Sequence, residues 1–208
     1  MTLGSRYDWR RFWCALLLAA AMAAAACRRL EYVSMKPLDD VGFSFTSEQQ
    51  IEQLDPTKEE VAELVKAVKG GLSESACVDL VRIARGQKRH FAEGDLVASL
   101  HTARISDPAI LELARLRQVE KWSGEAVAIR LTGISDRVIV AVAGHRAAGQ
   151  PVPGGASLAH LKDAGVSEET MIELLNRGLT DAYADSIVWR KKQHWTDQQV
   201  LQNFPPKS

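Results

Sequence analysis

Side chains that commonly do chemistry are sparse along this chain, which holds five histidines and three cysteines in 208 residues. No histidine belongs to a His-Glu-x-x-His pair or to another metal-ligand motif, so the sequence predicts neither a metal nor a cofactor. The glycine- and proline-rich stretch 144–155 lacks the Gly-Lys-Ser/Thr of a phosphate loop, and the chain has no Gly-x-Ser-x-Gly elbow. We therefore predict no catalytic residue, while a site assembled in space from separate parts of the chain stays open.

Serines followed directly by a carboxylate recur at near-regular intervals. Ser73, Ser106, Ser135 and Ser167 lie 33, 29 and 32 residues apart, and Thr196 starts a weaker copy. Each of these residues opens an apolar pattern of helical period, which is the position of a helix N-cap rather than of a nucleophile. One turn signature in every 30 or so residues is typical of stacked helical hairpins.

The four residues of each motif describe a tight corner between two helices. Gly71, Gly133 and Gly165 would end the first helix in a left-handed conformation that disfavours a Cβ atom. An aliphatic residue follows, then the capping serine, then an acidic residue that the helix dipole favours in a first turn. Arg104 stands where the other motifs have glycine, so its corner is predicted to differ.

Apolar residues lie at fixed distances from each capping serine, which predicts the helix faces that form the core. The fourth, fifth and seventh residues after the serine and the sixth before it are apolar, and in the first motif these are Cys77, Val78, Leu80 and Ala67. Cys77 is therefore predicted to be a buried small hydrophobe rather than a reactive thiol. The sequence predicts an all-α domain over 47–208, with about four tandem helical hairpins and a terminal helical cap.

Residues 28–46 show little helical periodicity and are predicted to be a tether. The first helix would begin at a capping box formed by Ser47 and Gln50, and the next at one formed by Thr57 and Glu60. Alternating apolar residues inside the tether are a weak strand signal and predict an extended strip packed on the domain. These residues are Val41, Phe43 and Phe45.

The first 27 residues have the composition of an export signal. Arg6, Arg10 and Arg11 precede 15 uncharged residues, a run too short for a membrane-spanning helix. The run ends in three alanines, and Cys27 follows. Here the sequence resembles bacterial lipoproteins, whose lipobox is a small or aliphatic triplet ending in Gly or Ala before a Cys. Ala24 stands where that family prefers Leu.

The resemblance implies cleavage before Cys27, a diacylglyceryl thioether on its sulfur and an acyl chain on its amine. Two or three acyl chains give stable anchoring, so the protein would be exported and held in the bacterial cell envelope. Because Arg28 rather than Asp follows Cys27, the family's sorting preference favours the periplasmic side of the outer membrane in a Gram-negative cell. Cleavage at an ordinary Ala-x-Ala site and an uncleaved anchor are the alternatives. The segment Leu161–Met171 also resembles hairpins of uncharacterised exported bacterial proteins, which implies fold and no chemistry.

Two groups of residues are candidates for binding a partner. Arginines recur late in the second helix of each hairpin, where they fit either the helix dipole or a row of cations facing a partner. They are Arg85, Arg117, Arg146 and Arg177. In the C-terminal stretch, Trp189 and Trp195 accompany several cations. They fit either a cap packed on the last repeat or an amphipathic surface for a membrane or partner.

Charge disfavours nucleic acid as a partner. The chain carries 26 basic and 26 acidic residues, and cleavage before Cys27 would remove three arginines and one aspartate, leaving a net charge of −2. A basic run at 82–90 does not offset this balance for phosphate binding. We expect a lipid-anchored envelope protein that acts as a non-catalytic interaction or scaffold module with an envelope protein partner. The alternative is an enzyme or small-ligand-binding protein whose site spans helical repeats.

Overall fold

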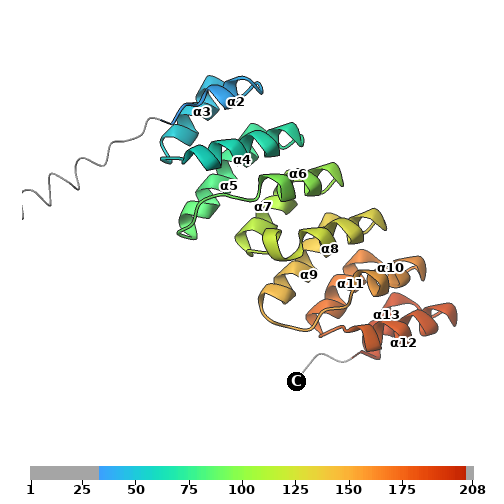
Figure 1. Ribbon diagram of the computed structural model, residues 1–208. Coiled ribbons are helices and arrows are strands. Elements are labelled where there is room, and N and C mark those ends of the chain that lie inside the picture. The colour runs from blue at the N-terminus through green and yellow to red at the C-terminus, as the bar shows by residue number, and fades with distance from the viewer. Residues whose placement is uncertain (1–32, 205–208) are drawn as a thin grey trace, which may run out of the picture. The chain divides into compact units, whose positions relative to one another are not determined.

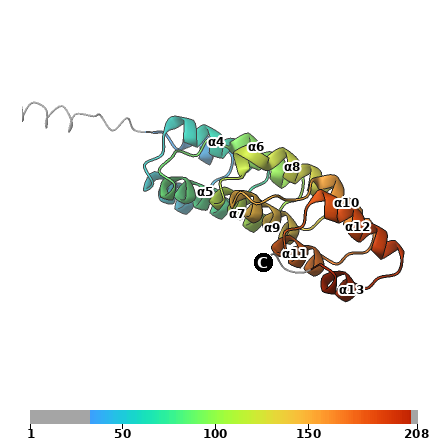
Figure 2. The same ribbon diagram turned by 90° about the horizontal axis from the view of Figure 1, so that it is seen from below.

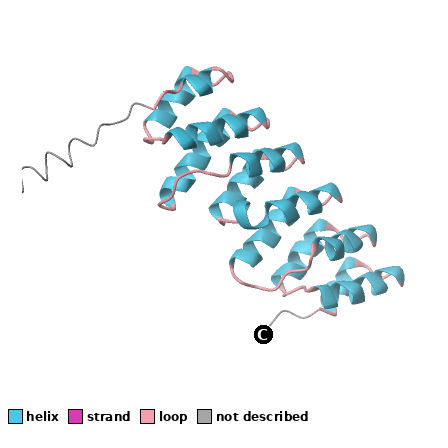
Figure 3. Cartoon of the chain, viewed as in Figure 1, coloured by secondary structure: helices cyan, strands magenta, loops and turns pink. Residues whose placement is uncertain are grey.

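Helices make up all the regular structure of residues 33–204, the part of the chain that the computed structural model describes. This confirms the predicted all-α fold. Residues from Ser34 onward form one packed unit, and loops join its helices (Figure 3). The helices are α2 (Lys36–Asp39), α3 (Phe45–Glu52), α4 (Lys58–Lys69), α5 (Glu74–Gly86), α6 (Gly94–Thr102), α7 (Asp107–Arg115), α8 (Val119–Leu131), α9 (Asp136–Ala147), α10 (Gly155–Asp163), α11 (Glu168–Asn176), α12 (Asp181–Lys192) and α13 (Asp197–Gln202).

Within this unit the helices stack in two rows (Figures 1 and 2). One row contains α4, α6, α8, α10 and α12, each packed on the next, and the other contains α3, α5, α7, α9, α11 and α13. Because successive helices alternate between the rows, α4–α5, α6–α7, α8–α9 and α10–α11 are repeats of one hairpin. The shorter pair α12–α13 follows them, as the repeated motif predicts.

The corners inside the hairpins have the predicted geometry. Gly71, Gly133 and Gly165 have φ angles of 98°, 80° and 79°, which are the left-handed values that favour glycine. At the first of these corners the Leu72 N–H donates to the Ala67 carbonyl at 3.1 Å, the backward bond of a Schellman motif. The serine that follows each corner has an extended backbone and is the N-cap of α5, α7, α9 or α11.

The corner at Arg104 does not differ from the others, so that prediction is wrong. Arg104 has a φ of 64°, and the Ile105 N–H donates to the Leu100 carbonyl at 3.1 Å, the same backward bond as in the glycine corners. Packing of the hairpin therefore fixes the corner, and the arginine adopts a left-handed backbone at a cost of about 1 kcal/mol.

The repeated apolar positions form the core between the two rows. At the fifth position after the serine only Val78 is buried, and Leu111, Val140 and Ile172 are half-buried. The residues predicted at the other three positions are all buried, which confirms the helix faces there. They are Ala67, Leu100, Ile129 and Leu161 before the serines, and Cys77, Ile110, Ile139, Met171, Leu80, Leu113, Val142 and Leu174 after them. Burial raises the pKa of the Cys77 thiol to about 12, so this cysteine is a small core hydrophobe, as its place in the repeat predicts.

The packed unit begins earlier than residue 47. Residues 36–39 form α2, which packs on α3 and α4, and Leu38 and Ile51 are buried. The predicted tether at 28–46 is therefore wrong for residues 34–46, while residues 28–32 lie outside the described part of the chain. The apolar residues that mark this start have no helical period in their spacing, so the sequence alone does not indicate a helix there.

The strand and the first cap predicted in this region are also corrected. Val41 lies in a turn, Phe43 is buried, and Phe45 is the exposed first residue of α3. Ser44 is the N-cap, and its Oγ accepts the Ser47 N–H at 3.4 Å. Ser47 is thus inside α3 rather than before it. The Thr57–Glu60 capping box at the start of α4 is confirmed.

A carboxylate ladder joins the corners of neighbouring hairpins in the α3–α13 row. The acidic residue after a capping serine or threonine accepts a hydrogen bond from the backbone N–H of the serine that caps the preceding helix of that row. These bonds join Glu74 to Ser44 (3.1 Å), Asp107 to Ser73 (3.2 Å), Asp136 to Ser106 (2.9 Å) and Asp197 to Ser167 (3.0 Å). The acids were predicted to serve the helix dipole, and the structure adds this role between hairpins.

One rung of the carboxylate ladder is missing. Glu168 makes no bond to Ser135 among the described hydrogen bonds, and the Ser135 hydroxyl is buried without a partner in this part of the chain. The two helices concerned are linked near their starts by an exposed ion pair instead, with Arg137 Nη1 lying 3.0 Å from Glu169 Oε1. The corners of α8–α9 and α10–α11 are therefore held together differently from the rest.

Candidate functional site

The four arginines predicted late in the second helices lie along one edge of the packed unit. At this edge the helices of the α3–α13 row end and the helices of the α4–α12 row begin. We call this the loop edge, formed by residues 87–93, 116–118, 148–154 and 177–180. Arg85 and Arg146 are in the last turns of α5 and α9, and Arg177 is the C-cap of α11. Arg117 lies beyond the end of α7, with a φ of 56°.

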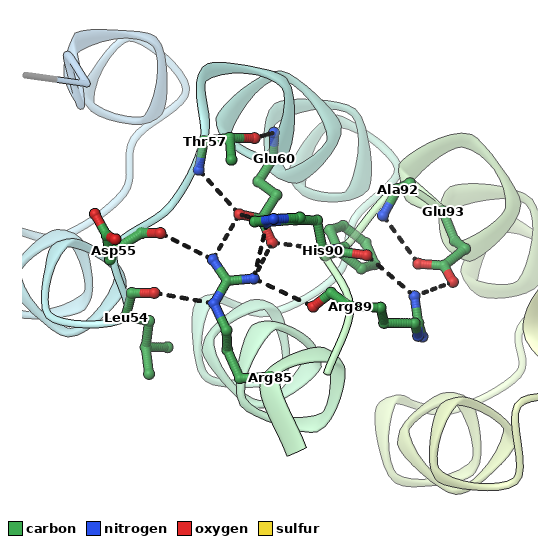
Figure 4. A network of polar contacts seen from close by, with 10 residues as sticks. Leu54, Asp55, Thr57, Glu60, Arg85, Arg89, His90, Ala92 and Glu93 are labelled. Atoms are coloured by element: carbon green, nitrogen blue, oxygen red, sulfur yellow. Dashed lines mark hydrogen bonds and ion pairs between the residues drawn. The ribbon is translucent and has the colours of Figure 1, made fainter. Parts of the chain in front are cut away.

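Arg85 is the centre of a polar network at the start of the loop edge (Figure 4). Its Nη1 and Nη2 atoms each lie 2.6 Å from one carboxylate oxygen of Glu60. The guanidinium also donates to the carbonyl oxygens of Leu54 (3.1 Å) and Asp55 (3.0 Å). This two-point pairing uses the planar fork of arginine, and it leaves little of the group for a partner.

Glu60 is buried, and its carboxylate is fully hydrogen-bonded. Besides Arg85 it accepts the backbone N–H groups of Thr57 (2.9 Å) and Phe91 (2.8 Å), and it lies 3.1 Å from Nδ1 of His90. Burial alone would raise the pKa of Glu60, but these hydrogen bonds outweigh it and lower that pKa to about 2. One charged group thus fixes the start of α4, the end of α5 and the loop 87–93.

The other three arginines differ in how far they are engaged. Arg177 Nη1 donates to the carbonyls of Leu201 (2.7 Å) and Phe204 (3.0 Å), so it holds the last helix in place. Arg146 lies 3.4 Å from Glu125 within its own hairpin. Arg117 is exposed and makes one long bond, 3.4 Å, to the Gln87 carbonyl. The structure therefore brings the predicted row onto one edge, but it commits Arg85 and Arg177 to the fold.

Further cations on the loop edge were missed as site residues. Lys88, His90 and Lys121 are exposed. Lys121 follows Arg117 by four residues, whereas Lys88 and His90 lie in the neighbouring loop, whose Gln87 carbonyl accepts a hydrogen bond from Arg117. The loops are tied together by Gln87, whose side-chain amide donates to the Ala114 carbonyl at 2.9 Å. The basic run 82–90 carried the signal for Lys88 and His90. Lys121 belongs to no basic run or repeated motif, so no local pattern marks it.

A serine, a histidine and an aspartate gather on the opposite edge without forming a catalytic triad. His101 Nε2 lies 3.5 Å from Asp107 Oδ1, and its Nδ1 lies 3.1 Å from the Gly70 carbonyl. The Ser73 hydroxyl instead accepts the Ala76 N–H as a helix cap. Both ring nitrogens are engaged by other groups, so His101 cannot serve as a base toward Ser73 in this arrangement. The residues connect two corners.

The C-terminal tryptophans have different surroundings. Trp189 is 63% exposed on α12, so it does not pack on the last repeat as the cap interpretation expects. Trp195 is half-buried, with the Arg190 guanidinium 5.1 Å from the centroid of its ring. Tyr183 stacks edge-on against Phe204. The cations of this stretch are largely engaged, since Lys191 also pairs with Asp197 at 2.8 Å.

Cys27 and the whole predicted signal segment, 1–27, lie outside the described residues. Within residues 33–204, no helix has both the length and the apolar character needed to cross a membrane. The same residues hold no group of three or more histidine, cysteine, aspartate or glutamate side chains placed to bind a metal ion.

Comparison with models of known protein families, with curated proteins and with solved structures finds no match to this chain.

Proposed function

We propose that the protein is a lipid-anchored component of the bacterial cell envelope that acts as a non-catalytic interaction or scaffold module. The interaction role is supported by one observation, the stacking of equivalent hairpins, which carries the same lateral surfaces from each hairpin to the next. Such surfaces suit extended contact with another macromolecule, because each repeat adds side chains at the same register.

The anchoring role is supported by the sequence before the packed unit. The charged start, the apolar run and Cys27 together resemble a lipoprotein signal, and Cys27 is seven residues before Ser34. An extended chain of this length spans at most about 25 Å. A lipid on Cys27 would therefore keep the hairpins close to the membrane surface.

Replacing the proposed lipid attachment site tests the anchor. Cys27→Ser should abolish incorporation of labelled palmitate in bacterial cells and release the protein from the membrane fraction, because no thioether can form. Cys14→Ser, a matched change within the apolar run, should leave both unchanged. Equal membrane partitioning of the Cys27→Ser and wild-type proteins would rule out the lipoprotein assignment.

Crosslinking in intact cells tests the interaction role. The wild-type protein should yield the same crosslinked partner repeatedly, and the Cys27→Ser protein should yield less of it because it no longer stays at the envelope. Capture of no specific protein at any crosslinker length would contradict the proposal.

A further inference from the structure

We propose that the two neighbouring corners of the loop edge, at residues 87–90 and 117–121, bind an acidic segment of a protein partner. The cations that would make the contact are Lys88, Arg117 and Lys121. This inference rests on the proposed interaction role and names the surface and the chemistry of the partner.

The backbone at these two corners is left-handed. Lys88 and Arg117 have φ angles of 57° and 56° at the residue where the corresponding corners of later hairpins have Gly149 and Gly178. Glycine adopts this conformation without the steric cost that a Cβ atom brings. Two adjacent corners thus keep a long cationic side chain at a position where glycine is more favourable. Arg104 adopts the same backbone on the opposite edge, so what distinguishes this pair is that two neighbouring corners of one edge both carry a cation there.

The three cations, Lys88, Arg117 and Lys121, are exposed and are not engaged in ion pairs within the described part of the chain. By contrast, Arg89 pairs with Glu93, and Arg115 pairs with Glu112. Lys121 lies in the first turn of α8, whose N-terminus has no side-chain cap, so the helix dipole adds to the local positive potential.

Hydrogen bonds to neighbouring elements hold the two corners in place. The network of Glu60 and Arg85 fixes the loop 87–93 on one side (Figure 4). Gln87 ties that loop to the end of α7 by hydrogen bonds to Ala114 and Arg115. The cations are therefore presented from a prearranged backbone, which reduces the entropy lost on binding.

The distribution of charge along the loop edge selects the kind of partner. The corner before this pair has Asp55 at the equivalent position, and the two corners after it have glycine. A membrane surface or a long polyanion would engage the whole edge, whereas here only two neighbouring corners have a cation at the left-handed position. Packed helices lie about 8–10 Å apart, and an extended chain advances about 3.3 Å per residue. Carboxylates three residues apart on an extended segment match this spacing.

Binding of a defined peptide tests the inference. The probe is a labelled peptide with three aspartates separated by glycine pairs, titrated with the full-length protein in detergent and followed by fluorescence anisotropy at low salt. The Lys88→Gly, Arg117→Gly double variant should weaken binding about tenfold, because two charge contacts are lost. The same variant should melt about 3 °C higher for each glycine, because the backbone strain is relieved.

Arg104→Gly is the matched control. It removes a cation from a left-handed corner on the opposite edge, so it should raise the melting temperature and leave peptide binding unchanged. Glu120→Gln, which removes an exposed carboxylate beside Lys121, should strengthen binding.

Three results would overturn the inference. They are unchanged binding by the double variant, equal binding of a peptide with asparagines in place of the aspartates, and binding of phosphatidylglycerol vesicles through the same lysine and arginine in place of the peptide. If the peptide fails to bind while crosslinking in cells still captures a partner, the interaction role stands and this surface assignment falls.

Discussion

Glu60 makes the stability of the α4–α5 hairpin depend on pH. The folded state lowers the pKa of this carboxyl from 4.5 to about 2, because the hydrogen bonds of Arg85, Thr57 and Phe91 outweigh the effect of burial. A group whose pKa is lowered by folding stabilises the native state fully above its unfolded pKa. That contribution is present above pH 4.5 and is lost as the pH falls toward 2.

Glu60→Gln should therefore lower the free energy of unfolding by about 3 kcal/mol at pH 7, because Arg85 is left without its charged partner. The difference from the wild type should shrink as the pH approaches 2. Urea unfolding at pH 7, 4 and 2.5 measures both effects. Glu59→Gln, an exposed change in the same helical turn, is the control and should scarcely move the midpoint. A constant difference across these pH values would contradict the assignment.

Individual residues show what a sequence can and cannot predict at this scale. The Thr57–Glu60 capping box follows from local spacing alone, and it is confirmed. The pairing of Glu60 with Arg85 joins residues 25 positions apart, and no local pattern indicates it. Arg104 shows the opposite failure. Its side chain argues against a left-handed backbone, yet the packing of the hairpin imposes one.

At the scale of the helix, the carboxylate ladder makes equivalent acids unequal. Asp197 accepts the Ser167 N–H and the Thr170 hydroxyl and pairs with Lys191, and Glu168 has no bond of this kind. Asp197→Ala should therefore lower the free energy of unfolding by about 1–2 kcal/mol. Glu168→Ala should cost only a few tenths of a kcal/mol, through the helix dipole.

Thermal or urea unfolding of the two variants measures this difference. Equal losses would mean that the acids act only on their own helices, as the sequence predicts, and that the ladder adds nothing. The helices and their buried faces could be predicted because each depends on spacing within about ten residues. The ladder could not, since its partners lie about 30 residues apart in sequence.

At the scale of the whole packed unit, the α12–α13 hairpin has polar residues at positions where the earlier hairpins have core residues. At the place in the repeat where earlier hairpins bury Ala67, Leu100, Ile129 and Leu161, the last one has Arg190, and where they bury Leu174 and its counterparts it has Asn203. Thr196 is the N-cap of α13, and its backbone N–H donates to the side-chain oxygen of Gln199 at 2.8 Å rather than to a carboxylate of another hairpin. Polar terminal repeats of this kind keep stacked arrays soluble.

Deletion of residues 180–208 should therefore expose apolar side chains of α10 and α11 and cause the remainder to aggregate, which light scattering after size exclusion measures. Conservative replacement of the exposed Trp189 by Tyr in the full chain is the control and should leave the protein monodisperse. A truncated protein that stays soluble and folded would show that α12–α13 are not a cap.

The candidate surface was only partly predictable. The repeat placed Arg85, Arg117, Arg146 and Arg177 at equivalent positions, and the structure places them along the loop edge. Which of these arginines are engaged in contacts within the fold depends on partners distant in sequence, such as Glu60 for Arg85. Cys27 lies outside the described residues, so the anchor stays a prediction from sequence.

The missing rung between Ser135 and Glu168 leaves the junction of α9 and α11 without the hydrogen bond that the other junctions of its row have. Every other junction in its row is pinned by a carboxylate on a backbone amide, whereas this one has the apolar packing of α9 on α11 and an exposed ion pair. The basic corners at 87–90 and 117–121 lie before this junction and the exposed Trp189 lies after it, so the two surfaces belong to the two parts of the stack that this junction joins.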